Sequence, residues 1–141
     1  MYGGDILELN GEFKDKTVLI TGATSDISRT ISELFYDAGA NLILSDNIDM
    51  IDKLKLVKSK LQKEEKGNID IINIDLTNVE SIKKLDGIYV DILVNCAGRN
   101  KFKKFLEVSE EDWDDIIDVN LKGTFFVSQV IANNMVNKNI K

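Results

Sequence analysis

The stretch Thr17–Ile31, TVLITGATSDISRTI, joins a short apolar run to a helical pattern through a small polar turn. The β-branched and apolar residues of 16–21 predict a buried strand. Apolar residues then recur at helical spacing from Ile27 to Ala38, and Gly39 predicts the end of that helix. A strand that enters such a turn and leaves it as a helix is a layout that can bind a nucleotide, because backbone N–H groups at the helix start face a phosphate.

The rest of the chain repeats this alternation of strand and helix. Apolar runs predict three more strands, at residues 41–45, at 69–74 and, as ILVN, within 88–95. Helical spacing predicts a surface helix over 49–66, a short helix over 77–85 and a long helix over 109–134. The last two begin with capping-box patterns, Thr77 with Glu80 and Ser109 with Asp112.

Strands that are apolar throughout are typical of a parallel sheet with helices on both faces. Right-handed crossovers then predict the strand order 3-2-1-4 of a doubly wound, Rossmann-like α/β fold. We expect this sheet to be truncated after the fourth helix, which leaves the fourth strand at an edge. Because a long apolar edge strand promotes aggregation, we expect a homo-oligomer or a complementing chain to cover it.

Length and composition narrow the class of protein. The 141 residues suit one domain, which we place at 16–141 after an N-terminal tail over 1–15. A net charge of −6 argues against nucleic-acid binding, and the lack of histidine with a single cysteine, Cys96, argues against a metal site. No apolar run approaches the roughly 18 residues that cross a bilayer. With no signal peptide and no possible internal disulfide, the sequence predicts a cytoplasmic protein away from membranes.

The turn itself supports two interpretations. Gly22 permits a tight bend before the helix, and the helix dipole would favour a pyrophosphate there. Asp26 would bring a negative charge close to that phosphate, or it is the N-cap of an ordinary helix. On the turn alone, both interpretations stay open.

Asp46 favours the nucleotide. It follows the second predicted strand, 24 residues after Gly22, where an acidic side chain accepts hydrogen bonds from the adenine ribose. Its carboxylate would repel the 2′-phosphate of NADP, and no Arg or Lys lies in the turn or just after Asp46 to attract one. NAD is therefore favoured over NADP. The alternative is an aspartate in an ordinary loop.

Small or polar residues also follow the third and fourth strands, as Asp75-Leu76-Thr77 and as Asn95-Cys96-Ala97-Gly98. Open parallel sheets bind ligands at this edge, so four such ends together indicate a ligand crevice. Asn120 lies within the long helix, where an amide is either a satisfied buried group or a functional one. Gly123, in the same helix, indicates close packing.

Taken in order, these motifs resemble the amino-terminal half of a short-chain dehydrogenase/reductase. The resemblance runs from about Phe13 to the end of the chain, through TGATSDIS, Asp46, DLT, NCAG and DVNL. It implies hydride transfer between a nicotinamide cofactor, here NAD, and an alcohol or carbonyl carbon. It implies a pyrophosphate site made by Gly22, Thr24, Ser25, Asp26 and Ile27.

The resemblance also places the rest of the cofactor. Asp46 would hold the adenosine ribose, and Asp75 with Leu76 would meet the adenine. Asn95, Ala97 and Gly98 would form the wall beside the cofactor. Asn120 corresponds to the active-site asparagine of the family, whose backbone carbonyl helps to hold a water in the proton relay.

Two departures from the family pattern bear on activity. Asp26 and Ser28 replace two glycines of the turn, so we expect weakened cofactor binding. The family's catalytic serine and Tyr-x-x-x-Lys are also missing, because the residues four positions after Tyr2, Tyr36 and Tyr89 are isoleucine, alanine and leucine. We therefore expect an N-terminal fragment without turnover of its own.

Two other functions fit parts of the pattern. A non-catalytic relic, or a module for nucleotide binding or assembly, would explain the lost glycines and the missing catalytic residues. A methyltransferase that uses S-adenosylmethionine also has a glycine turn and an acidic residue after its second strand. The Thr-Gly opening and the Asn-Cys-Ala-Gly stretch favour the dehydrogenase.

Overall fold

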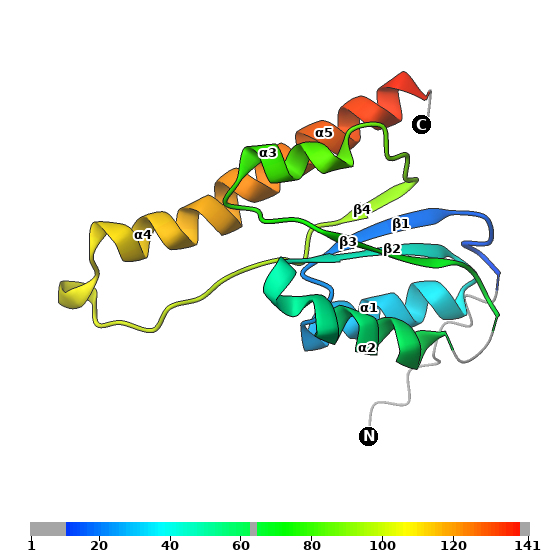
Figure 1. Cartoon of the computed structure of the whole chain (residues 1–141), viewed down its shortest axis with the longest axis horizontal. Coiled ribbons are helices and arrows are strands. Elements are labelled where there is room, and N and C mark those ends of the chain that lie inside the picture. Colours follow the sequence, from blue (N-terminus) through cyan, green and yellow to red (C-terminus); the bar gives the residue numbers. More distant parts are fainter. Residues whose placement is uncertain (1–10, 63–64, 139–141) are drawn as a thin grey trace.

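A computed structural model describes residues 11–62 and 65–138, and in it four parallel strands form one sheet (Figure 1). The strands are β1 (Thr17–Thr21), β2 (Asn41–Asp46), β3 (Ile69–Asn73) and β4 (Ile92–Val94). Their order is β3-β2-β1-β4, which confirms the predicted Rossmann-like order.

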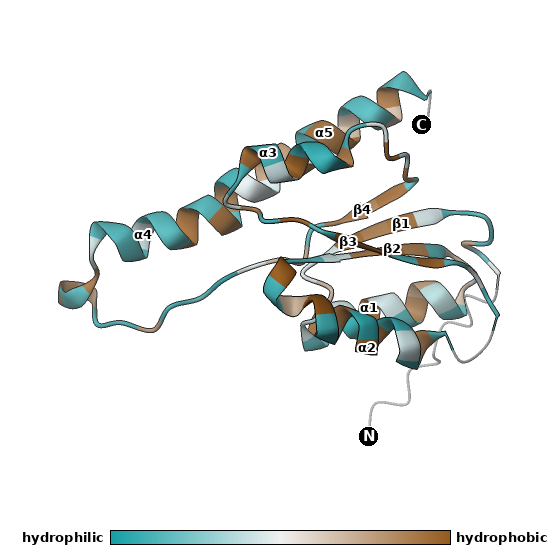
Figure 2. Cartoon of the chain, in the orientation of Figure 1, coloured by the Kyte–Doolittle hydropathy of each residue, from teal (hydrophilic) through white to brown (hydrophobic). Residues whose placement is uncertain are grey.

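Helices cover both faces of this sheet. Figure 1 shows α1 (Asp26–Asp37) and α2 (Ile51–Leu61) on one face, and α3 (Val79–Ile82) and α5 (Thr124–Asn137) on the other. Short 3-10 helices η1 (Ile48–Met50) and η2 (Lys83–Leu85) adjoin α2 and α3. Figure 2 shows the apolar residues concentrated in the strands and alternating with hydrophilic residues along the helices.

The core forms two apolar clusters, one on each face of the sheet. Val18 and Ile20 of β1 join the cluster under α1 and α2, whereas Leu19 joins the cluster under α3 and α5. All three are fully buried. Successive side chains of a strand point to opposite faces, so an apolar run without alternation is what a doubly covered sheet requires.

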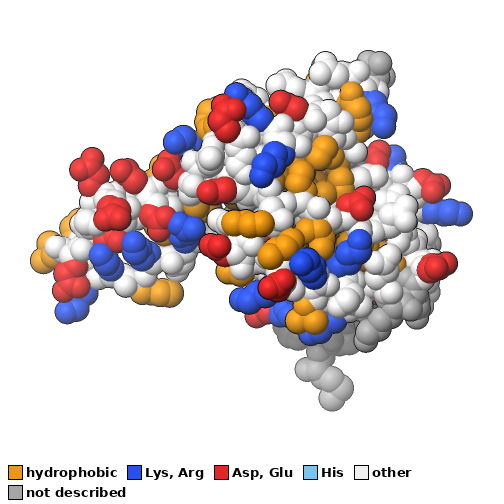
Figure 3. All heavy atoms as spheres, in the orientation of Figure 1, with side chains coloured by type: hydrophobic (Ala, Val, Ile, Leu, Met, Phe, Trp, Pro, Cys, Tyr) orange, Lys and Arg blue, Asp and Glu red, His pale blue; other side chains and the backbone are white. Residues whose placement is uncertain are grey.

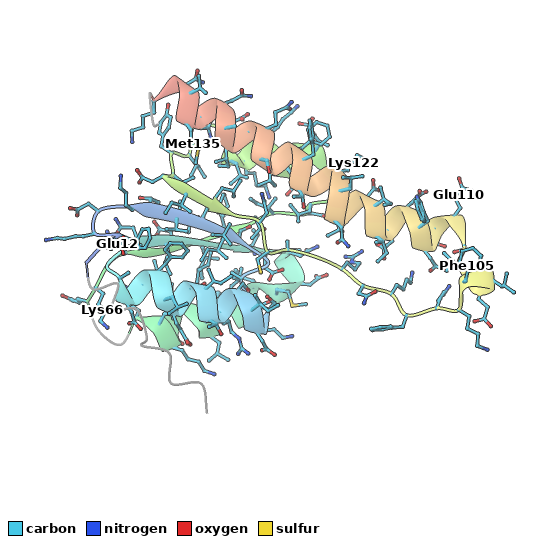
Figure 4. All side chains as sticks on the ribbon, turned by 180° about the vertical axis from the view of Figure 1, so that it is seen from behind. Glu12, Lys66, Phe105, Glu110, Lys122 and Met135 are labelled. Atoms are coloured by element: carbon cyan, nitrogen blue, oxygen red, sulfur yellow. The ribbon has the colours of Figure 1, made fainter. Side chains whose placement is uncertain are left out.

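A second unit extends from the sheet as an arm, residues 99–117. It consists of a loop that contains η3 (Phe105–Glu107) and of α4 (Glu110–Ile117), and Figure 1 shows it projecting away from the sheet. The predicted capping box is confirmed, because Ser109 and Asp112 bond to each other's backbone N–H groups. Figure 4 places Phe105 and Glu110 at the far end of this arm.

The predicted long helix is present as a continuous α4–α5 unit, but it contains a π-helical turn, η4 (Asp118–Gly123). Gly123 closes that turn where a Cβ atom would lie 2.6 Å from the carbonyl oxygen of Leu76. The close packing expected at Gly123 is therefore confirmed. Within the described residues, no helix combines the length and apolarity that crossing a membrane requires.

Two predicted boundaries are wrong. Asn78, rather than Thr77, caps α3 by accepting the Glu80 N–H at 3.0 Å, because the Thr77 hydroxyl donates to Asp75 at 2.7 Å instead. The fourth strand, expected within residues 88–95, is confirmed at Ile92–Val94, where it pairs with β1.

The helix predicted over 49–66 begins as η1 and ends at Leu61. Gly67 lies against the residue that precedes β2, because a Cβ atom there would come within 2.4 Å of the Ala40 carbonyl oxygen. At the other end of the domain, residues 1–10 of the predicted tail lie outside the described residues. Phe13 packs edge-on against Phe35, with ring centroids 5.0 Å apart.

Candidate cofactor site

The site begins at the turn between β1 and α1. Gly22 has a φ of +63°, and a Cβ atom there would lie 2.6 Å from the Cα atom of Ala97. Both the left-handed backbone and the close approach require glycine. Ser25, rather than Asp26, is the N-cap of α1, because its side chain accepts the Ser28 N–H at 3.2 Å. The alternative role of Asp26 as the cap is therefore wrong.

Ser28 fits the turn in place of a glycine. Its side chain is fully buried, and its hydroxyl donates to the Gly22 carbonyl at 2.6 Å. The Ser25 hydroxyl lies 2.7 Å from that of Ser28. The hydroxyl thus ties the start of α1 back to the glycine, and the turn holds its shape through hydrogen bonds that a glycine would not make.

The Asp26 side chain points to solvent. It is 91% exposed and forms an ion pair with Arg29, one helical turn further on. Solvent and the paired guanidinium both reduce the field of this carboxylate at the turn. Ile27 is also exposed, at 70%. Neither residue borders the cavity described below.

Asp46 at the end of β2 is fastened to the same turn. Its Oδ2 atom accepts hydrogen bonds from Thr24, from the backbone N–H at 3.1 Å and from the hydroxyl at 2.7 Å. Its Oδ1 atom accepts the Asn47 N–H at 2.9 Å. A carboxylate has about four acceptor sites, so it keeps capacity for a ligand hydroxyl while its position is fixed.

A third contact joins the turn to the loop after β4. The Thr21 hydroxyl oxygen accepts the N–H groups of Cys96 at 3.1 Å and of Ala97 at 3.2 Å. The side chain of Asn95, the preceding residue, instead donates to the Ser128 hydroxyl on α5 at 2.9 Å. The backbone of 96–98 therefore lies against Gly22, while the Asn95 side chain faces α5.

Asn120 lies on the π-helical turn and holds the same loop from the other side. Its Oδ1 atom accepts the Arg99 N–H at 2.8 Å, and its Nδ2 atom donates to the Arg99 carbonyl at 2.9 Å. Both ends of the amide are used, so Asn120 is a satisfied polar group, although it is exposed rather than buried.

These contacts surround one cavity of about 300 Å³ at the carboxyl ends of the strands. Eight of the predicted cofactor residues line it: Gly22, Thr24, Ser25, Asp46, Asp75, Leu76, Ala97 and Gly98. Asp26, Ile27, Asn95 and Asn120 do not. The sequence analysis missed four notable lining residues, namely Asp49, Met50, Arg99 and Val119. Arg99 directly follows the NCAG stretch, and that adjacency was the available signal.

Comparison with known proteins identifies the fold that carries this cavity. The family model described as short chain dehydrogenase matches residues 16–140. The chain belongs to the short-chain dehydrogenase family. Members of this family bind nicotinamide dinucleotides.

Individual curated oxidoreductases are also similar to this chain. The chain is 32% identical over 128 residues to an NAD-dependent glycerol dehydrogenase of Listeria innocua, covering 86% of this chain and 48% of that protein. It is 35% identical over 139 residues to the oxidoreductase UcpA of Salmonella typhimurium, covering 91% and 49%. The chain thus spans about half the length of the curated relatives it matches.

Solved structures of the family agree in fold. A short-chain type dehydrogenase/reductase from Mycobacterium marinum superposes with a TM-score of 0.83 at 25% identity, over 94% of this chain and 54% of that one. A 3-oxoacyl-(acyl-carrier protein) reductase with bound NAD from Brucella melitensis gives 0.81 at 28% identity, over 93% and 52%.

Proposed function

We propose that the cavity binds NAD and that the chain is the cofactor-binding half of an oxidoreductase. The reaction is hydride transfer between nicotinamide and an alcohol or carbonyl carbon. The observation that carries this proposal is the fixed Asp46 carboxylate, which borders the cavity and is bonded to the turn that receives a pyrophosphate. An acidic group at this position accepts hydrogen bonds from ribose hydroxyls.

The charges around the cavity favour NAD over NADP. Asp46 and Asp49 both line the wall that follows β2, and a 2′-phosphate there would meet two carboxylates. The single cation among the described lining residues, Arg99, comes from the loop after β4.

The start of α1 supports a pyrophosphate site. Ser25 and Gly22 line the cavity, and α1 has 12 residues, so its dipole favours an anion at this end. Asp26 opposes the anion only weakly, since its side chain is 91% exposed and paired. Binding is expected to be weaker than for a turn with three glycines.

We also propose that this chain does not supply the proton-transfer residues of the reaction. Tyr36 is buried, and its hydroxyl donates to the Gly67 carbonyl at 3.3 Å. Tyr89 packs beneath Lys138, whose Nζ atom lies 4.8 Å from the ring centroid. Neither lines the cavity, and Tyr2 lies outside the described residues. Reading the gene beyond codon 141 for a serine and a Tyr-x-x-x-Lys segment tests this part of the proposal.

The cofactor proposal is tested by titrating the chain with NADH and with NADPH, followed by nicotinamide fluorescence. Asp46→Asn is expected to weaken NADH binding about tenfold, because one charged hydrogen-bond acceptor is lost. It should also narrow the preference for NADH over NADPH, which a general loss of structure would not do.

Asp52→Asn is the matched control, because Asp52 is 93% exposed on α2 and paired only along the helix surface. This control should bind NADH as the unaltered chain does. Absence of saturable NADH binding at millimolar concentration would contradict the proposal, as would an unchanged preference in Asp46→Asn. An affinity for S-adenosylmethionine above that for NADH would favour a methyltransferase instead.

We propose, further, that the protein forms a homo-oligomer. Three apolar side chains of the arm are almost fully exposed, namely Phe102 at 94%, Phe105 at 89% and Leu106 at 91%. Figure 3 shows hydrophobic side chains on the arm among charged ones. Large apolar side chains that are exposed together on one projecting segment are typical of an interaction site.

A further inference from the structure

Three cations lie at alternate positions of the loop after β4 and all face α4. Arg99 forms an ion pair with Asp115, Lys103 forms one with Asp112, and Lys101 Nζ lies 2.7 Å from Asp112 and 3.9 Å from Asp115. In extended backbone, alternate side chains point the same way. The loop and the helix are therefore joined by a row of opposite charges.

The two lysines serve to hold the loop. Asp112 is buried, with a side chain 7% exposed, and it also accepts the Ser109 N–H at 3.1 Å and the Ser109 hydroxyl at 2.9 Å. The hydrogen bonds from Lys101, Lys103 and Ser109 hold the pKa of this carboxyl far below its usual range. Asp112 thus joins the loop to the start of α4, and this end of the row is structural.

Arg99 is placed differently. It lines the cavity, where it is the only cation among the described lining residues, which also include Asp46, Asp49 and Asp75. Its side chain is 44% exposed, and its partner Asp115 is 30% exposed. A guanidinium has five N–H donors, of which one carboxylate engages at most two. Donors remain for a second anion.

The backbone of Arg99 is held by hydrogen bonds, whereas its guanidinium still has unused N–H donors. Asn120 binds both its N–H and its carbonyl, at 2.8 and 2.9 Å, and Val119 beside Asn120 also lines the cavity. The start of the Arg99 side chain is thus fixed at the end of the cavity formed by the β4 loop and the π-helical turn. A pyrophosphate is expected elsewhere, at the start of α1.

We propose that Arg99 is a specificity-determining residue that binds a carboxylate or phosphate group of the substrate. The anion takes the free N–H donors of the guanidinium, and Asp115 keeps the group oriented. This inference rests on the proposed function, because it takes the cavity as the place where dinucleotide and substrate meet. The substrate class it names is an alcohol or carbonyl compound that carries an anionic group.

The sequence contains only two arginines, Arg29 and Arg99, which makes a direct test simple. The side-chain Nε–H signals of both are followed by NMR during titration with malonate or with inorganic phosphate, at ionic strength held constant with NaCl. The Arg99 signal is expected to shift saturably at roughly millimolar ligand. The Arg29 signal should not move, since Arg29 lies outside the cavity.

Variants separate recognition from structure. In Arg99→Gln, the backbone amides of Gly98 and Asn120 report binding, which should weaken about tenfold or more, whereas Arg99→Lys should retain part of it. The matched control Lys104→Gln removes a neighbouring cation of the same loop that is 85% exposed, pairs with Glu107 and does not line the cavity, and it should bind the anion normally. NADH affinity, measured separately, should change less than about twofold in Arg99→Gln.

Three results would overturn the inference. Equal shifts of the two arginines, or no saturable shift, would leave Arg99 as a structural partner of Asp115. A loss of NADH affinity in Arg99→Gln as large as in Asp46→Asn would assign Arg99 to the cofactor. Failure of the unaltered chain to bind NADH would count against the proposed function, and the anion titration would still be read independently.

Discussion

Gly22 lies where the turn contacts the β4 loop. The stability that this contact contributes can be measured separately from the cost of backbone strain. Gly87 also has a positive φ, +75°, but nothing lies within 4 Å of a Cβ atom there. Gly87→Ala should therefore cost only the left-handed strain, about 1–2 kcal/mol of unfolding free energy. Gly22→Ala adds a collision with the Ala97 backbone, which cannot rotate away, and should cost about 1–3 kcal/mol more. Urea denaturation of both variants measures the difference, and equal losses would mean that the loop yields freely.

The sequence showed that Ser28 replaces a glycine of the turn, but it did not show what the Ser28 side chain does there. From the sequence, a side chain at this glycine position is expected to weaken cofactor binding at the turn. The hydrogen bond from its hydroxyl to the Gly22 carbonyl exists only in the folded turn. The same limit applies to Asp26, which the sequence placed near a phosphate and whose side chain faces solvent. Which way a side chain points at a helix start is decided by the cap, and Ser25 holds that position.

At the scale of elements, Asn120 links the α4–α5 unit to the loop after β4. Asn120→Ala removes both hydrogen bonds to the Arg99 backbone, and because the site is exposed we expect a loss of about 1 kcal/mol in total. The more specific result is faster hydrogen exchange at the Arg99 amide. Asn133→Ala, at an exposed position of α5, is the control and should leave that exchange unchanged. Slow exchange in Asn120→Ala would show that the ion pairs alone hold the loop.

The order of the elements was predictable because strand periodicity and crossover handedness leave few topologies. The capping box of α4 was predictable for a similar reason, since both of its residues lie within one turn. The cap of α3 was missed because Thr77 has a competing partner, Asp75, that only the folded loop brings close. Arg99 was missed because its place in the cavity is set by Asn120, 21 residues away.

At the scale of the whole molecule, the arm is ordered by charge and yet exposes apolar side chains. Its loop is tied to α4 by ion pairs, so the exposure of Phe102, Phe105 and Leu106 is a fixed feature of the surface. Several large apolar side chains exposed together on one segment are typical of an interaction surface. β4, at the sheet edge, pairs only with β1 among the described strands and adds a second unsatisfied surface. Both features support association with a second copy.

Light scattering tests this association directly. We expect a dimer or larger species at micromolar concentration. The double variant Phe105→Ser, Leu106→Ser should weaken this association about tenfold or more, because two exposed apolar side chains would no longer be buried between copies. Leu56→Ser is the matched control, because Leu56 is 53% exposed on α2, away from the arm. If the arm variant associates as strongly as the control, the edge of β4 rather than the arm holds the copies together. If the unaltered chain stays monomeric at high concentration, the proposal is refuted, and a different partner would have to cover the arm.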